Sequence, residues 1–212
     1  MSKDTNSEFD AAAFWAKHRK TILGGVTAVA VVAGGGWFWT ASRNLKESRA
    51  EGAYASAERT FYSGNAQLAT TELTRVVTRY GDTRAGIRAT MLLSQAHYNA
   101  GRHSEGVEQL QGVAGSRAAR PYRAAIHALI AAGLEDQGKF DEAATAYSQA
   151  ASAATTQFDR DLYEADQARA LASAGKAEAA LVIWRRHAAR ETAPTTSEAR
   201  LRIGELSARA SN

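Results

Sequence analysis

Four glycines in this sequence recur at a constant interval of 37 residues, at Gly64, Gly101, Gly138 and Gly175. Three further columns keep the same interval. Small residues stand seven positions before each glycine (Ala57, Ser94, Ala131, Ala168) and five after it (Ala69, Gly106, Ala143, Ala180), and large residues stand nine after it (Leu73, Leu110, Tyr147, Trp184). A repeated unit of this size cannot bury its apolar face alone, so the period predicts stacked units that share a continuous core.

The columns indicate a helical hairpin as the repeating unit. Glycine can leave a helix in the left-handed region of backbone space without the penalty that a Cβ atom brings. Small residues on either side of the turn let two helices approach closely, and the large residue fills the groove between hairpins. With two prolines in 212 residues, the composition also favours helix. We therefore expect eight helices in pairs, from about residue 50 to about residue 190.

Two prolines and one capping pattern predict the helix boundaries near the end of the chain. Pro121 suits the first turn of the fifth helix. Pro194 is expected to end the eighth helix, and Thr195 with Glu198 forms a capping-box pattern that begins a final helix to about residue 210. This last helix is expected to cover the open end of the stack.

Residues 21–42 contain no charged side chain, and as a helix they would reach roughly 33 Å, enough for a hydrocarbon core of about 30 Å. Trp15 precedes the segment and Trp37 and Trp39 close it, as expected for aromatic side chains at the headgroup level. Several glycines lower its hydrophobicity and helix propensity. The segment is predicted to be a single transmembrane helix.

Basic residues indicate its orientation. Lys17, Arg19 and Lys20 crowd the N-terminal flank, which by the positive-inside rule places the N-terminus in the cytoplasm and the repeats in the periplasm. The alternative is a cleaved signal peptide with a small-residue site at residues 28–30. The long, partly acidic N-terminal region argues against cleavage, so we expect an uncleaved anchor in a bacterial inner membrane.

The sequence thus predicts an all-α protein with one transmembrane helix followed by an α-solenoid. The expected order is a cytoplasmic segment (1–20), the transmembrane helix (21–42), a connector (43–49), four repeats (50–192), and a capping helix with its tail (193–212).

The repeat columns resemble the tetratricopeptide repeat, whose unit has small residues at its eighth and twentieth positions and a turn glycine at its fifteenth. Residues 138–144 (GKFDEAA) with Tyr147 give the best match, and residues 96–101 (AHYNAG) a good one. The unit here is three residues longer, and it lacks the proline usual near the end of each repeat. The resemblance implies superhelical stacking of hairpins, with a curvature that the longer unit leaves open.

The whole chain resembles the bacterial ancillary subunit of the Sec translocon. The residues that carry this likeness are Phe14-Trp15, the apolar segment, and the turn at residues 79–83 (RYGDT) ahead of the second repeat. The resemblance implies a periplasmic repeat domain that associates with the translocon and with periplasmic chaperones. The periplasmic cell-division coordinator family has similar repeats, so the fold is better specified than the family.

No feature of the sequence indicates an enzyme. The absence of cysteine excludes thiolate metal sites and a cysteine nucleophile. The histidines show no ligand spacing, His97 falls in a packed column, and no phosphate-binding or dinucleotide motif occurs. Basic and acidic residues mix closely along the repeats, which disfavours nucleic acid as a partner. We expect no catalytic residue, no cofactor and no metal.

A binding groove is predicted instead, because in this class of repeat the first helix of each pair lines the concave face. Transferring the columns gives a candidate set of side chains: Tyr54, Glu58, Phe61, Tyr62, Met91, Gln95, Tyr98, Asn99, Glu135, Asp136 and Arg169. Aromatic rings there suit peptide capture. The alternative is that Phe61, Met91 and Tyr98 only seal one repeat against the next.

The resulting functional hypothesis is a membrane-anchored, non-enzymatic scaffold that recruits exported proteins or chaperones to an inner-membrane complex such as the Sec translocon. Its expected partners are proteins, with lipid contacts through residues 21–42, and neither nucleic acid nor a small-molecule substrate. Two alternatives stay open: a structural subunit that clamps a membrane complex without binding a mobile client, and a secreted periplasmic repeat protein.

Overall fold

The computed structural model describes residues 37, 38 and 40–210 of the chain. The chain divides into two compact units, residues 1–46 and 47–212. In the first unit, residues 37, 38 and 40–46 are helical, and Trp37 and Phe38 are exposed. No helix among the described residues is both long enough and apolar enough to cross a membrane. Most of the predicted transmembrane segment, residues 21–36 and 39, lies outside the described residues.

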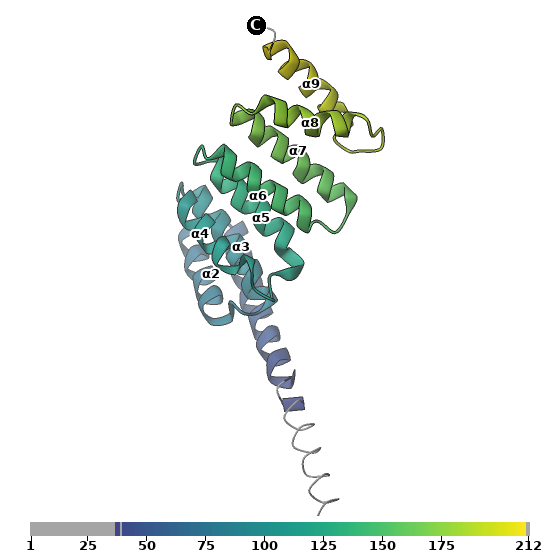
Figure 1. The fold of residues 1–212 in the computed structure, drawn as a ribbon. Helices are drawn as coiled ribbons and strands as arrows, with labels where there is room; N and C mark the ends of the chain where they lie inside the picture. The colour runs from purple at the N-terminus through teal and green to yellow at the C-terminus, as the bar shows by residue number, and fades with distance from the viewer. Residues whose placement is uncertain (1–36, 39, 211–212) are drawn as a thin grey trace, which may run out of the picture. The chain divides into compact units, whose positions relative to one another are not determined.

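The second unit is a stack of helical hairpins in which consecutive helices pack on one another (Figure 1). Residues 47–62 are helical and pair with α2 (Ala66–Tyr80). The next pairs are α3 (Arg84–Asn99) with α4 (His103–Ala114), α5 (Arg123–Glu135) with α6 (Phe140–Ala153), and α7 (Gln157–Ser173) with α8 (Ala177–Ala188). The final helix, α9 (Thr196–Ala210), packs on α8. The predicted all-α solenoid is confirmed.

The repeat columns occupy the positions that the sequence assigns to them. All four repeat glycines have positive φ, between 71° and 84°, and no other described residue does. Every member of the three accompanying columns is buried: Ala57, Ser94, Ala131 and Ala168, then Ala69, Gly106, Ala143 and Ala180, then Leu73, Leu110, Tyr147 and Trp184. One sequence period therefore specifies both the hairpin turns and the centre of each hairpin's core.

Three of the four hairpin turns share one hydrogen-bond pattern. The amide of the residue after Gly101, Gly138 or Gly175 donates to the carbonyl five residues earlier, at 2.8 to 2.9 Å. This bond satisfies a carbonyl that the end of the helix leaves without a partner, and it requires the left-handed conformation at the glycine. The first turn differs, because there Asn65 caps α2 by accepting a bond from the Leu68 amide at 3.2 Å.

The first two repeats are joined by polar contacts as well as by a shared core. Glu47 accepts hydrogen bonds from the amides of Arg84 and Ala85, at 3.3 and 3.2 Å, where its negative charge suits the N-terminus of α3. Four residues further along each helix, Arg88 pairs with Glu51 at 3.1 Å. These contacts connect residues 37 or 38 positions apart, so the spatial stack keeps the register of the sequence repeat.

The predicted boundaries near the prolines need correction. Pro121 lies in a short 3₁₀ turn, η1 (Arg120–Tyr122), so α5 begins just after it. The eighth helix ends at Ala188, before Pro194, and the loop between α8 and α9 contains that proline. The expected capping box is also replaced, because the Thr195 hydroxyl lies 2.7 Å from Nδ1 of His187 and Glu198 accepts from Arg169.

The turn glycines give a direct stability prediction. In Gly138→Ala the new methyl group meets no atom within 4 Å, but φ at this position is +71°, so the cost is backbone strain alone. We expect the free energy of unfolding to fall by about 1 kcal/mol, measured by thermal melts followed by circular dichroism.

The matched control is Gly112→Ala in the last turn of α4, where the added methyl group also meets nothing within 4 Å but the backbone is helical. There alanine should raise stability by up to about 1 kcal/mol, because glycine is the poorer helix former. Equal effects at the two sites would contradict a special role for the turn glycine.

Candidate partner-binding groove

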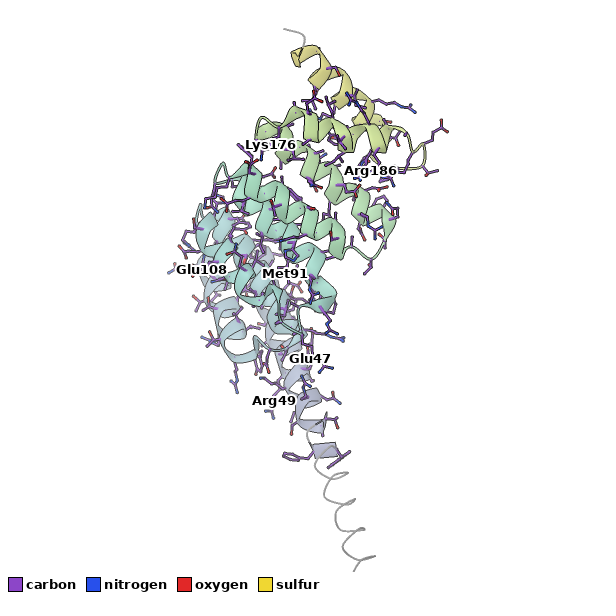
Figure 2. The ribbon with its side chains drawn as sticks, viewed as in Figure 1. Glu47, Arg49, Met91, Glu108, Lys176 and Arg186 are labelled. Carbon is purple, nitrogen blue, oxygen red and sulfur yellow. The ribbon has the colours of Figure 1, made fainter. Side chains whose placement is uncertain are left out.

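A pocket of about 320 Å³ lies along the first helices of the last three hairpins. Its lining combines two predicted groove residues with six that were not predicted to line the groove: Met91 and Gln95 from α3, Ala125, Ala128 and Leu129 from α5, Tyr147 from α6, and Tyr163 and Asp166 from α7. Met91, labelled in Figure 2, lies in the middle of the stack, whereas Glu108 of α4 lies at its outer edge. We call this pocket the groove pocket.

The lining of the groove pocket combines apolar and polar side chains, which we call its floor and its rim respectively. Methionine, leucine and alanine side chains form the floor, and the two alanines leave room that larger residues would fill. Gln95 supplies an amide, Tyr163 a hydroxyl and Asp166 a carboxylate. Burial raises the pKa of Tyr163, so its hydroxyl keeps its proton and can donate. Such a lining suits a peptide with an apolar side chain and polar groups beside it.

Tyr98 belongs to the packing between repeats. Its hydroxyl donates to the carbonyl of Leu129 at 3.0 Å. Its ring fills space left by two glycines, since a Cβ atom at Gly106 or Gly133 would lie 2.4 to 2.5 Å from it. His103 stacks on the ring with centroids 5.7 Å apart. Of the two interpretations that the sequence allowed for Tyr98, the structure favours the seal.

The first-repeat members of the predicted groove separate into buried and exposed residues. Tyr54 is only 5 % exposed; its hydroxyl donates to Glu58 at 2.5 Å, and the Arg88 guanidinium lies 4.2 Å from its ring centre. Burial, with the Glu58 bond, raises the pKa of Tyr54 to about 12. Phe61 packs against the same core, whereas Tyr62 is 74 % exposed and touches only the edge of Phe61 among described rings. These residues do not line the groove pocket.

Two of the remaining predicted residues, Glu135 and Asp136, form an acidic neighbourhood beside the groove pocket. Tyr147 donates to Glu135 at 2.9 Å, and Asp136 lies 3.1 Å from Nδ1 of His103. Burial raises the pKa values of Glu135 and Tyr147, and the two carboxylates near Glu135 add to its shift. Asn99 is exposed at the end of α3.

One arginine serves two carboxylates in this neighbourhood. Arg169 donates to Asp166 on its own helix and to Glu198 of α9 at 2.7 Å. Burial raises the pKa of Asp166, against the opposing influence of Arg169. The structure therefore brings Glu135, Asp166 and Glu198 together around Arg169, leaving an excess of negative charge.

A second pocket, of about 260 Å³, lies where α7, α8 and α9 meet. Trp184 is fully buried at its base, and Arg202 on its rim pairs with Glu205 at 2.9 Å. Arg169 lines this pocket as well. Each charged side chain of this lining already has an ion-pair partner, because Arg202 pairs with Glu205 and Arg169 pairs with Asp166 and Glu198.

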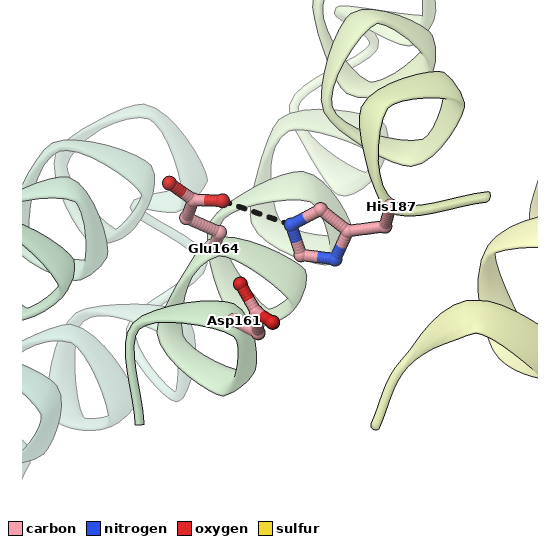
Figure 3. Close-up of side chains that lie close together, drawn as sticks. All are labelled: Asp161, Glu164 and His187. Carbon is pink, nitrogen blue, oxygen red and sulfur yellow. Dashed lines mark hydrogen bonds and ion pairs between the residues drawn. The ribbon is translucent and has the colours of Figure 1, made fainter. Parts of the chain in front are cut away.

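Three side chains of metal-ligand type also converge, at His187, Glu164 and Asp161 (Figure 3). Their ligand atoms all lie within 4.8 Å of one another, and Nε2 of His187 is 2.9 Å from Glu164. The sequence shows no ligand spacing at His187, and its convergence with Asp161 and Glu164 arises from the packing of α8 on α7. His97, by contrast, is buried as predicted, and burial lowers its pKa.

Arginines already neutralise both carboxylates of this cluster. Arg190 donates to Asp161 at 2.7 Å, and Arg186 pairs with Glu164 at 2.8 Å. A divalent cation would have to displace these arginines. With His187 fully buried and also bonded to Thr195, the arrangement joins α7, α8 and the following loop as a structural network, which we call the Asp161 network.

Comparison with known proteins now identifies the class. A family profile described as "Tetratricopeptide repeat-like domain" matches residues 12–181, so the chain belongs to the tetratricopeptide repeat-like family. No curated protein sequence matches it.

Solved structures agree at the level of the fold. TPR-like repeats of a Podospora anserina protein titled a kinesin light chain align with a TM-score of 0.61 and 21 % identity, over 76 % of this chain and 86 % of that one. A TPR protein of Thermus thermophilus aligns with a TM-score of 0.50 and 20 % identity, over 89 % and 98 %. Proteins with such repeats generally bind other proteins and are typically not enzymes.

The assignment of Tyr98 to packing can be tested by alanine substitution. Tyr98→Ala removes a ring held between two glycines and a hydrogen bond to a backbone carbonyl, so we expect a loss of about 2 to 3 kcal/mol in unfolding free energy. Tyr62→Ala, at a ring that is 74 % exposed, should change it by less than about 0.5 kcal/mol. If Tyr98→Ala left the unfolding free energy unchanged, the Tyr98 ring would be assigned to the binding surface instead.

The Asp161 network gives a second pair of matched variants. Asp161→Asn leaves Arg190 without a charged partner at a carboxylate that is 3 % exposed, and we expect a loss of about 2 kcal/mol. Asp141→Asn removes the pair with Lys176 at 3.0 Å, where both side chains are more than half exposed, and should cost less than about 0.5 kcal/mol. Urea denaturation of both variants checks the difference, and similar costs would reject the structural role.

Proposed function

We propose that this protein is a membrane-anchored interaction scaffold, whose groove pocket holds a segment of a partner protein. The observation that carries the proposal is the pocket itself, which opens along three successive first helices and combines an apolar floor with a polar rim. Membership of the tetratricopeptide repeat-like family supports protein binding as the general role.

Membrane anchoring is supported by the sequence. The uncharged segment 21–42, its flanking tryptophans and the basic residues before it favour a single span with the N-terminus in the cytoplasm and the repeats in the periplasm. The resemblance to the ancillary subunit of the Sec translocon suggests that complex, its exported clients and periplasmic chaperones as partners. A protease-protection assay tests this orientation. Externally added protease should leave the repeat domain intact in whole cells and should digest it in spheroplasts.

The experiment that tests the scaffold is affinity purification of the full-length protein in mild detergent, with mass spectrometry of its partners and of its own N-terminus. Ala125→Trp places a large ring in the groove pocket from a position on α5 that is partly exposed. The matched control, Ala179→Trp, makes the same change on the exposed face of α8.

We expect partner recovery to fall at least about tenfold in Ala125→Trp and to stay unchanged in Ala179→Trp, because only the first change occupies the pocket. Circular dichroism must show both variants folded. Unchanged recovery with Ala125→Trp would overturn the groove as the binding site and would favour a structural subunit that contacts its complex elsewhere. A mature chain that starts beyond Ala30 would overturn the anchor.

A further inference from the structure

The charge balance around the groove pocket specifies its occupant more closely. We infer that the groove pocket binds a peptide segment that carries lysine or arginine beside an apolar side chain. This inference rests on the proposed function, since it assumes that the groove pocket is the binding site, and it adds the chemistry of the partner.

The carboxylates that face or adjoin the groove pocket outnumber the arginines. Asp166 lines the pocket, and Tyr147, which also lines it, donates to Glu135 at 2.9 Å. Burial, together with the charge of Asp166, raises the pKa of Glu135. Glu198 influences Asp166 in the same way. Arg169 already donates to two of these three carboxylates, and Nε of Arg202 lies 3.5 Å from Glu198. Three carboxylates therefore share two arginines.

The arginine one turn before Met91 on α3 is likewise engaged. Arg88 of α3 pairs with Glu51 at 3.1 Å, approaches Glu58 at 4.0 Å, and covers the ring of Tyr54. It therefore brings no free positive charge toward the pocket, and two carboxylates accompany it.

A basic side chain meets three requirements of this site at once. Its positive charge compensates the partly buried carboxylates, whose raised pKa values reflect the cost of holding charge there. Its aliphatic stem can lie on the floor formed by Met91 and Leu129, as the stems of lysine and arginine commonly do on apolar surfaces. The amide of Gln95 and the hydroxyl of Tyr163 remain to bond the peptide backbone.

An acidic segment would meet the opposite conditions. A peptide carboxylate beside Asp166 would add a like charge in a partly desolvated place, which is a strong selection against wrong partners. A neutral apolar segment would fill the floor and leave the carboxylates as they are. The three kinds of segment should therefore bind in the order basic, neutral, acidic.

The test uses the full chain in detergent and three short fluorescent peptides that share the same leucine and alanine positions. The remaining positions carry lysine, glutamine or glutamate, and affinity is measured by fluorescence anisotropy at low and high salt. We expect the lysine peptide to bind at least about tenfold tighter than the glutamate peptide, with a difference that shrinks as salt screens the charges.

Variants on the rim separate specific binding from general attraction between charges. Asp166→Asn should weaken the lysine peptide about threefold to tenfold, whereas Asp141→Asn on the exposed part of α6 should leave it unchanged. Gln95→Glu adds a carboxylate to the rim and should tighten the lysine peptide, and Gln95→Lys should weaken it. These Gln95 changes lie at a half-buried position and keep the test open if Asp166→Asn folds poorly.

The outcomes distinguish this inference from the proposed function. If the peptides bind without preference for lysine, or none binds, or the rim variants have no effect, then the basic occupant is overturned. The scaffold then still stands provided that Ala125→Trp releases the native partners. If Ala125→Trp leaves both native partners and lysine peptide bound, the groove pocket itself is wrong, and both proposals fall.

Discussion

The left-handed turn at each repeat glycine is the constraint on which the rest of the stack depends. With φ near +75° at these positions, the second helix of a hairpin returns along the first, and the small residues on either side allow close contact. Each hairpin then presents one apolar face to the next. Because the turns recur every 37 residues, the hairpins stack in register, and α3, α5 and α7 all contribute side chains to the groove pocket.

The repeats differ in what they do with this shared frame. Between the second and third repeats, the Tyr98 ring packs against two glycines and fills the interface, so it is not available to bind a partner. In the fourth, the Asp161 network ties α7 to α8 and to the longer loop before α9. Between these two fixed regions lies the groove pocket, with alanines at its floor. Rigid flanks around an open centre suit a scaffold, since little order has to be gained on binding.

Much of the fold could be predicted from the sequence, but little of the groove pocket. The column transfer included Met91 and Gln95, which line the groove pocket, but not Tyr163 and Asp166, because adjacent helices cross at an angle and the lining drifts from one column to another. It also grouped Tyr54 and Tyr98 with the groove, although both are held in packing. A row of large residues on one face of a helix has the same sequence pattern whether it packs against another repeat or binds a partner protein.

The sequence by itself determined the hairpin unit, its turns, its buried columns and the all-helical stack, because these depend on backbone preference and on contacts within one period. Only the tertiary structure decided which polar groups meet. The cluster of Asp161, Glu164 and His187, and the sharing of Arg169 between Asp166 and Glu198, join residues of α7 to residues 23 to 32 positions further along the chain, with no spacing signature. Such pairs depend on how one helix crosses the next, and that angle is set by the packing of side chains across the whole stack.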